Sequence, residues 1–583
     1  MDVTSIATGF FSNLIGHFTN MPVKETVIFD IAFILIIAAV FAFIARILRQ
    51  PLIPAYVITG LLIGPLFWGF VKNSQIVFAF SEIGIAFLLF TAGLEISFKK
   101  IREVGLGKIF IIGLLQIVAI FTIAYLSAGF FNLTALQAAY IGIILSFGST
   151  MVVVKLLADS HELVTLHGRL ILGILLLQDL VAIIAIVIFT TGGFSMGPIS
   201  IALGKLVLMV VIALLLQKIV LRGLFSFAAR STELLFLSSL AVLFLFIVMS
   251  YALDLSIVIG AFIAGVSLAN SPFKQELESR ISPLRDFFAI LFFVSLGMQV
   301  VFSGVRENIG LFWFLIIGSV IVKTLITFIL TRATGYRSRT SFMTSISLAQ
   351  LSEFSLIIGM LGVSLGAIDV GILSTVILAT VITMALTPYL VTYKNGLFNI
   401  LKYPLKIFNF LPVKEHLEFV DKNEKHILLV GAHRMGSVLI KHLLENTGDR
   451  HNLLVIDYNP EIIKALIKKN ISAIYGDLGG AEILNKVHMN KMKIIISTIP
   501  SFDDNLSLLK RVKQINSKAT IILTAERISE ASELYNAGAD YVILPKVLAG
   551  DEVLGLIHKP KSEIKEDRVK QLKKLSEIHR LLY

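Results

Sequence analysis

The sequence has no cysteine, and only 15% of its 583 residues are charged. Without cysteine, the chain forms no disulfide bond, no thiolate metal site and no thiol nucleophile. The scarcity of charge, beside a hydrophobic content of 56%, excludes an ordinary soluble protein. The first 24 residues also lack a basic stretch followed by a cleavable apolar segment, so we predict no signal peptide.

What the sequence does have is a series of long apolar segments between residues 27 and 393. We predict about thirteen α-helical membrane spans, because each segment is long enough to cross a bilayer and short polar turns separate them. The predicted spans cover residues 27–48, 54–70, 76–97, 106–130, 134–158, 166–190, 198–221, 232–252, 255–270, 285–303, 308–331, 341–363 and 368–392.

The basic residues predict how these spans are oriented. Lys and Arg gather in alternate loops, as in the loop that contains Lys99, Lys100 and Arg102. The opposite loops contain only Lys72 and Arg306. Since the side richer in Lys and Arg is cytoplasmic, we predict a multi-pass protein of the cytoplasmic membrane, with the N-terminus outside and the C-terminus inside. Much of the net charge of +12 lies in these loops, so it does not indicate a nucleic-acid partner.

Asp179, preceded by Gln178, lies in the middle of the predicted span 166–190. A carboxylate at that depth costs roughly 3 kcal/mol on insertion scales, so a chain keeps it where it faces water, an ion or a partner charge. The pattern favours a cation or proton site at Asp179. The alternative interpretation is a hydrogen bond that holds two helices together.

Two other spans contain predicted helix breaks. The fifth span has Gly148, Ser149 and Thr150 at its centre, and the twelfth is polar around Gln350 and Glu353. Helices that are broken near the middle of the membrane form the ion sites of secondary transporters, and the two breaks occupy matching places in two halves of a repeated architecture. The alternative is packing between spans through small hydroxyl residues.

The remaining deep polar residues predict how the site works. Lys323, central in the eleventh span, needs a partner, and we expect it to pair with Asp179 when no cation is bound. Glu353 is expected to be a structural hydrogen-bond partner at the second break. Gln178 cannot titrate and offers a carbonyl to a cation. A single titrating group predicts that one proton is exchanged for one cation, without net charge movement.

The sequence changes character after residue 393. A basic, aromatic linker, 394–424, precedes short apolar runs that alternate with helical stretches. This alternation predicts a doubly wound parallel sheet over residues 425–550, followed by a charged helical tail, 551–583. The predicted strands include residues 426–430, 453–456, 473–474, 494–496, 521–523 and 541–543.

The first of these strands is followed by an incomplete dinucleotide-binding motif. Gly431 and Gly436 are its outer glycines, and Asp457 follows about 20 residues later, where an acidic residue holds a ribose. The middle glycine is replaced by His433, which obstructs the approach of a pyrophosphate. An adenine nucleotide with its phosphate at the helix N-terminus is still compatible with the motif, and a nucleotide-free scaffold is the alternative. The predicted nucleotide-contacting residues here are Gly431, His433, Arg434, Met435, Gly436 and Asp457.

Taken together, these motifs resemble the monovalent cation:proton antiporter-2 family, in particular its potassium efflux systems of the Kef type. The resemblance covers about residues 27–550, and its C-terminal part resembles the nucleotide-binding regulatory domain called RCK or TrkA-N. The matching stretches are Leu89–Glu95, Gly148–Thr150, Leu177–Asp179, Phe262–Val266, Leu291–Met298, Gln350–Phe354 and Tyr475–Asp477.

The resemblance implies an elevator-type homodimer with inverted repeats, in which the broken spans five and twelve cross beside Asp179. It implies that the pair Gln178–Asp179 is the form associated with potassium, and it adds Asp477 to the nucleotide-contacting residues. The predicted loop 274–283 resembles the acidic regulatory loop of the family in part. We expect Glu276, Glu278 and Arg280 in this loop to contact the regulatory domain.

The sequence thus predicts an α-helical polytopic membrane protein with a C-terminal α/β Rossmann-like domain. Residues 1–26 form a predicted extracellular segment, and 27–393 the antiporter domain. We predict electroneutral exchange of potassium for protons, controlled by AMP, NAD(H) or ATP, with no resident metal. Sodium:proton antiport and a ligand-gated potassium channel remain alternatives, although a T-V-G-Y-G filter is missing. An enzyme, such as a membrane-tethered dehydrogenase, is disfavoured because no substrate domain follows the sheet.

Overall fold

The computed structural model describes residues 23–65, 67, 71, 74–95, 106–160, 162–163, 165–190, 196–411, 418–420, 425–432, 435–446, 452–476 and 487–582. The chain divides into two compact units. The first is helical and consists of residues 1–163 and 167–413, and the second consists of residues 414–583 together with the short segment 164–166.

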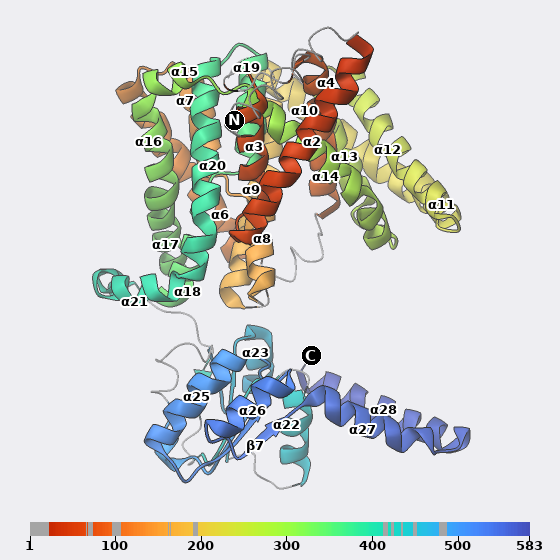
Figure 1. Ribbon diagram of the computed structural model, residues 1–583, viewed down its shortest axis with the longest axis vertical. Coiled ribbons are helices and arrows are strands. Elements are labelled where there is room, and N and C mark those ends of the chain that lie inside the picture. Colours follow the sequence, from red (N-terminus) through yellow and green to blue (C-terminus); the bar gives the residue numbers. More distant parts are fainter. Residues whose placement is uncertain are drawn as a thin grey trace, which may run out of the picture. The chain divides into compact units, whose positions relative to one another are not determined.

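The first unit is built from helices that span most of its length (Figure 1). Ten helices of the described residues are long and apolar enough to cross a membrane, and shorter apolar helices include Leu52–Ile63, Ile257–Leu268 and Glu353–Ser364. Each of the thirteen predicted spans falls on one helix or on consecutive helices, although the number of spans that cross a membrane stays a prediction. The helices are α2 Val23–Ile47, α3 Leu52–Ile63, α4 Ser74–Glu95, α6 Leu106–Ser127, α7 Ala135–Ser146, α8 Thr150–Asp159, α9 Leu166–Phe189, α10 Met196–Leu216, α11 Arg222–Ala228, α12 Thr232–Ala252, α13 Ile257–Leu268, α14 Lys274–Met298, α15 Phe302–Glu307, α16 Ile309–Ile317, α17 Lys323–Ala333, α18 Ser338–Ser347, α19 Glu353–Ser364, α20 Val370–Thr392 and α21 Lys394–Leu405.

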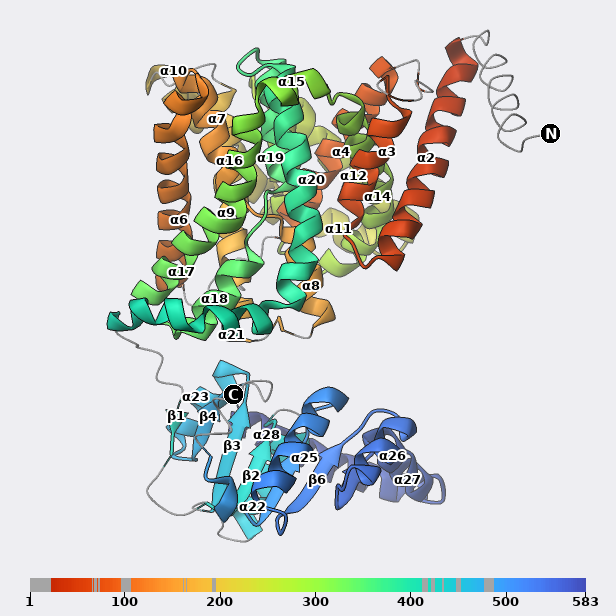
Figure 2. The same cartoon turned by 60° about the vertical axis from the view of Figure 1, so that its left-hand side comes forward.

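These helices pack in two groups (Figure 2). One group contains α2, α3, α4 and α10 to α14, and the other contains α6 to α9 and α15 to α20. Close packing in the first group depends on glycine. A Cβ atom on Gly93 of α4 would lie 2.3 Å from the Phe262 carbonyl oxygen, and one on Gly265 of α13 would lie 2.0 Å from the Phe90 carbonyl oxygen. Small residues at such contacts let helix backbones approach closely in a membrane.

Both predicted helix breaks are confirmed. The chain leaves α7 at Ser146 and begins α8 at Thr150, and it leaves α18 at Ser347 and begins α19 at Glu353. Ser149 and Ser352 begin the second helix of each pair, because their side chains accept hydrogen bonds from backbone N–H groups of α8 and α19. The breaks also touch each other, since Gln350 Nε2 donates a hydrogen bond to the Ser149 carbonyl oxygen at 3.2 Å.

The segment 274–283, predicted as a loop, is instead the beginning of α14, which continues to Met298. The prediction was wrong because the segment has an apolar helical face: Leu277 and Ile281, one turn apart, are both fully buried. Glu276 lies in the first turn of this helix, where a negative charge is favourable. Glu276 and Arg280 are exposed, and Glu278 is half-buried.

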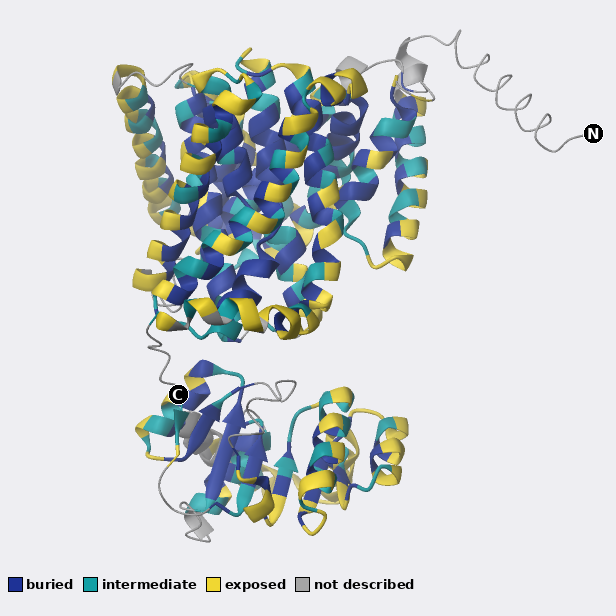
Figure 3. Ribbon diagram, turned by 90° about the vertical axis from the view of Figure 1, so that its left-hand side faces the viewer, coloured by how far each residue is buried: buried dark blue, intermediate teal, exposed yellow. Residues whose placement is uncertain are grey.

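The second unit contains a seven-stranded sheet in the order β1-β4-β3-β2-β5-β6-β7 (Figure 2). All neighbouring strands are parallel except β1, which runs antiparallel to β4. The predicted strands are confirmed, and the sheet adds one that the sequence did not indicate, β1, inside the predicted linker 394–424. In the sequence, helices lie between most successive strands, and the residues of the central strands β2 and β3 are mostly buried (Figure 3). The strands are β1 Glu418–Phe419, β2 Ile427–Val430, β3 Leu453–Asp457, β4 Ala473–Tyr475, β5 Ile494–Ser497, β6 Thr520–Thr524 and β7 Tyr541–Ile543; the helices are α22 Met435–Asn446, α23 Pro460–Lys468, α25 Phe502–Ile515, α26 Ile528–Asn536, α27 Pro545–Ile557 and α28 Lys561–Leu582.

Candidate functional site

Asp179 lies on α9 inside the first unit, with only 8% of its surface exposed. Its Oδ2 atom accepts a hydrogen bond from the Thr150 hydroxyl at 2.9 Å. Thr150 is the first residue of α8, so the carboxyl group lies at a helix N-terminus, where a partial positive charge favours an anion. No Lys, Arg or His among the described residues forms an ion pair with Asp179.

Gln178 is fully buried and forms a hydrogen bond with the backbone of the first break. Its Oε1 atom accepts a hydrogen bond from the Gly148 N–H at 2.9 Å. Its Nε2 atom donates to Oε1 of Gln116, on α6, at 3.3 Å. The sequence interpretation missed Gln116, although a lone Gln in the otherwise apolar span 106–130 was a usable signal.

Lys323 is fully buried but does not pair with Asp179, so that prediction was wrong. Its ammonium group donates hydrogen bonds to the carbonyl oxygens of Phe147 and Gln350, both at 2.6 Å. A third carbonyl oxygen, that of Leu145, lies at 3.5 Å. Carbonyls at helix C-termini have no partner within their own helix and carry partial negative charge. One lysine therefore donates to carbonyl oxygens in both helix breaks.

The second break contributes oxygen atoms that have no hydrogen-bond donor. Glu353, the first residue of α19, is 5% exposed, and its carboxyl group lies close enough to Asp179 to interact with it electrostatically. Among the described residues, Glu353 Oε2 and Gln350 Oε1 are buried without a hydrogen-bond partner. Carbonyl and carboxylate oxygens replace the water around an alkali cation. The two breaks thus bring together Ser149, Thr150, Asp179, Gln350 and Glu353, as the sequence predicted.

Glu95, at the end of α4, is a further acidic group near this site. It interacts electrostatically with Asp179 and Glu353, and charges on α14, namely Lys274, Glu278 and Arg285, act on it in turn. Of the three residues predicted for regulation, Glu278 is therefore the one whose charge acts on Glu95. In the described part of the chain, no group of three His, Asp or Glu side chains is arranged to hold a metal ion.

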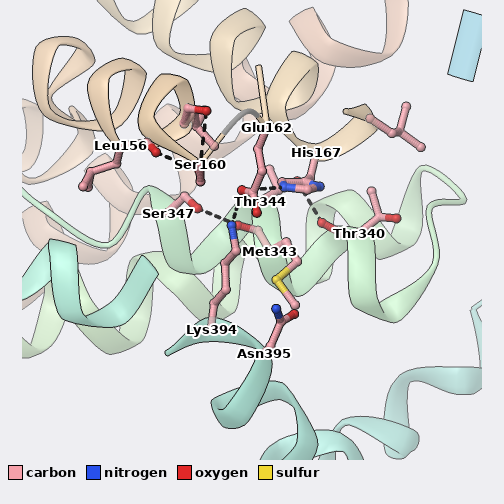
Figure 4. Close-up of polar contacts among 12 residues, drawn as sticks. Leu156, Ser160, Glu162, His167, Thr340, Met343, Thr344, Ser347, Lys394 and Asn395 are labelled. Carbon is pink, nitrogen blue, oxygen red and sulfur yellow. Dashed lines mark hydrogen bonds and ion pairs between the residues drawn. The ribbon is translucent and has the colours of Figure 1, made fainter. Parts of the chain in front are cut away.

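A second polar cluster links the segment between α8 and α9 to the start of α21 (Figure 4). Glu162 Oε2 lies 3.1 Å from His167 Nε2 and forms an ion pair with the Lys394 ammonium group, whose side chain is 5% exposed. Burial alone would raise the pKa of Glu162, but the hydrogen bond from His167 and the charge of Lys394 outweigh it and lower this pKa to about 2. This cluster was not predicted, because Lys394 lies 232 positions after Glu162 in the chain.

In the second unit, the turn after β2 has the geometry of a dinucleotide-binding fold. Gly431 has a φ of 87°, and a Cβ atom on Gly436 would lie 2.0 Å from the Gly431 carbonyl oxygen, so both positions require glycine. Asp457 Oδ2 accepts a hydrogen bond from the Ala432 N–H at 2.6 Å, which fixes the turn. Met435 begins α22, whereas His433, Arg434 and Asp477 lie outside the described residues.

Comparison with known proteins adds two family matches. Residues 32–392 match the transmembrane sodium/hydrogen exchanger family, and residues 427–545 match the TrkA-N domain. The glutathione-regulated potassium-efflux system proteins KefC of Escherichia fergusonii and Escherichia coli K12 are each 27% identical over 497 residues, or 83% of this chain and 77% of theirs. The sodium proton antiporter MjNhaP1 of Methanocaldococcus jannaschii superposes with a TM-score of 0.51 at 16% identity, covering 65% of this chain and 98% of the antiporter.

Proposed function

The chain belongs to the transmembrane sodium/hydrogen exchanger family and is a cation:proton antiporter rather than an enzyme, and from this premise we propose that it exchanges potassium for protons at Asp179. The observation that carries the proposal is the placement of the Asp179 carboxyl group, buried at the N-terminus of α8 beside both helix breaks and without an ion-pair partner among the described residues. A proton and a cation compete for such a group. Their competition couples the two fluxes, because each must leave before the other binds.

Potassium is favoured as the cation by the curated relatives, whose names describe potassium efflux. Gln178 supports a one-to-one exchange, because it adds no titrating group beside Asp179. The two groups of helices support an elevator mechanism, since one group contains both breaks and Asp179 while the other contains neither. In this mechanism the group that contains both breaks moves against the other group. The other group forms the contact between two protomers of a homodimer in the cytoplasmic membrane.

Regulation by an adenine nucleotide is the second part of the proposal. The glycine turn after β2 and the TrkA-N match support a nucleotide site in the C-terminal unit. In the proposed orientation the N-terminus lies outside the cell and the C-terminus lies in the cytoplasm. The ion pair between Lys394 and Glu162 supplies a route to the transport site. Lys394 begins the segment that leads toward the sheet, and Glu162 precedes the helix that carries Asp179.

The test is a proton-flux assay on reconstituted liposomes, with potassium, sodium and lithium supplied separately. We expect flux with potassium, and a loss of at least 100-fold in Asp179→Asn, because an amide cannot exchange a proton for a cation. Asp254→Asn, which alters an exposed carboxylate paired with Lys205, is the matched control and should keep its flux. Undiminished flux in Asp179→Asn would reject the assignment.

Sodium is the second candidate cation, since it gives its name to the matched family. The same assay separates the two candidates. Flux with sodium and none with potassium would support cation:proton antiport, with sodium in place of potassium as the transported cation. Isothermal titration calorimetry of the full chain with AMP, ATP and NADH tests the regulatory part, and an absence of heat with all three would contradict it.

A further inference from the structure

Gln116 is a fully buried polar side chain in the middle of α6, and its hydrogen bond to Gln178 connects it to the proposed transport site. Its Oε1 atom accepts the hydrogen bond from Gln178 Nε2 at 3.3 Å. Its own Nε2 atom is buried without a hydrogen-bond partner among the described residues. A buried amide group with an unsatisfied donor is costly, and an apolar side chain would fill the same space at lower cost. The hydrogen bond to Gln178 is therefore the contribution that distinguishes Gln116 from a methionine or leucine.

The packing of α6 holds Gln116 at this place. One turn earlier, Gly113 faces α9, where a Cβ atom would lie 2.7 Å from Cδ2 of Leu177. One residue later, the Ile117 carbonyl oxygen accepts a hydrogen bond from the Ser146 hydroxyl, at the end of α7, at 3.4 Å. These contacts fix α6 against both α9 and the first helix break. Gln116 therefore meets Gln178 on a rigid support.

The two hydrogen bonds of Gln178 fix which end of its carboxamide faces which way. The Gly148 N–H donates to the carbonyl oxygen of Gln178. The Gln116 carbonyl oxygen accepts from the amide nitrogen of Gln178. Neighbouring helical residues point about 100° apart, so Gln178 and Asp179 border one region of the site. Without Gln116, rotation of the Gln178 side chain would free its carbonyl oxygen from Gly148 and let it reach a cation at Asp179.

We propose that Gln116 is a positioning residue that determines cation preference by keeping the Gln178 carbonyl oxygen on Gly148 and away from the transported cation. In this proposal Gln178 is not a cation ligand, in contrast to the expectation from the sequence. The number of oxygen ligands around a cation and their field strength set the preference between sodium and potassium. With Gln178 held back, the site has one oxygen ligand fewer, so the contact with Gln116 sets this preference. The proposal rests on the proposed exchange at Asp179.

The test compares Gln116→Met with the wild type in liposomes that contain the full chain, with kcat and KM measured for potassium and for sodium. Methionine matches the size of glutamine and removes the acceptor. We expect the ratio of kcat/KM for sodium to that for potassium to change at least threefold. Gln116→Glu keeps an acceptor at the same reach and should restore a ratio near that of the wild type.

Two further variants separate positioning from general damage. In a Gln178→Met background, Gln116→Met should leave the cation ratio unchanged, because the side chain through which it acts is gone. Ser146→Ala removes one hydrogen bond between α6 and α7 but keeps the contact between Gln116 and Gln178. Because the close packing of Gly113 against α9 still holds this part of α6, the variant should also leave the ratio unchanged.

The outcomes are distinct for this proposal and for the proposed function. A cation ratio that stays the same in Gln116→Met overturns the role of Gln116, as does a ratio that shifts equally in the Gln178→Met background or in Ser146→Ala. If the wild type shows no exchange with either cation, the proposed function fails first. If the wild type exchanges sodium alone, sodium replaces potassium as the proposed cation. A change in the KM for sodium in Gln116→Met then tests the role of Gln116 by itself.

Discussion

Asp179, which is buried, and Glu162, which is half-buried, are two acidic residues of the same helical unit with opposite surroundings. Glu162 lies between two nitrogen groups, those of His167 and Lys394, whereas Asp179 has a neutral partner, the hydroxyl of Thr150. A carboxylate already neutralised by a fixed cation has nothing to gain from a mobile one. One without such a partner gains most from a proton or a cation, so the comparison separates a structural carboxylate from a transport carboxylate.

Lys323 is a buried lysine of the same helical unit, and its hydrogen bonds explain why it does not neutralise Asp179. The ammonium group is occupied by carbonyl oxygens of both breaks. Its charge stabilises the broken helices and not Asp179. The same lysine would have cancelled the carboxylate if it had paired with it, and the site would then have needed to break that pair in every transport cycle.

The largest expected effect is that of Lys323→Met on stability. The variant leaves buried carbonyl oxygens of both helix breaks without their donor, and we expect a loss of about 3–5 kcal/mol. A thermal unfolding experiment in detergent would show it as a marked fall in Tm, whereas Lys155→Met, at an exposed position of α8, should change Tm little. If Asp179→Asn restored the stability of Lys323→Met, the two residues would be a pair and the comparison would fail.

A smaller loss of stability is expected for Glu162→Gln. The variant removes the ion pair with Lys394, most of which is shielded from water, and should cost about 1–3 kcal/mol. Potassium-driven proton flux should persist, because Glu162 binds neither ion. Glu461→Gln, which removes an exposed pair with Lys464, serves as the control. Loss of all flux in Glu162→Gln at unchanged stability would make Glu162 part of the ion path.

The pH dependence of this loss follows from the pKa of Glu162, which is lowered to about 2 in the folded protein. A lowered carboxyl pKa contributes stability that is present above the unfolded pKa of about 4.3 and is lost as the pH falls toward 2. The difference in Tm between the wild type and Glu162→Gln should therefore be constant from pH 8 to pH 5. A difference that grows or shrinks within that range would show that another group titrates.

The smallest expected effect concerns the membrane potential. With Asp179 as the single carrier, one proton replaces one cation and no net charge moves. Proton flux in liposomes should stay the same when a potential is imposed, and solid-supported-membrane recordings should show no steady transport current. A current that reverses with the potential would indicate a second carrier, for which Glu353 is the candidate.

The sequence was sufficient for features that depend on residue type and spacing. Asp179 was evident because a carboxylate is costly inside an apolar span, and both breaks were evident from clusters of glycine, serine and polar residues. The strands of the second unit were predictable from short apolar runs. β1 was missed because two residues at a sheet edge leave almost no pattern, and the start of α14 was missed because its charge hid the buried pair Leu277 and Ile281.

What the sequence could not supply was the pairing of residues far apart in the chain. We predicted a pair between Lys323 and Asp179 from their charges alone, but Lys323 donates its hydrogen bonds to backbone carbonyl oxygens. Because every residue has a backbone carbonyl, the residue types do not reveal which one binds the lysine. The contact between Gln116 and Gln178 and the one between Glu162 and Lys394 join different helices, so only the packing of the fold reveals them.

The central claim is that a proton and a cation compete for the unpaired carboxyl group of Asp179. Proton release measures this directly: potassium chloride is added to the purified protein in weakly buffered detergent near neutral pH, and the protons set free are counted per protomer. We predict release that saturates with potassium in the wild type and is absent in Asp179→Asn. No release from an actively exchanging wild type, or equal release from Asp179→Asn, would contradict the account.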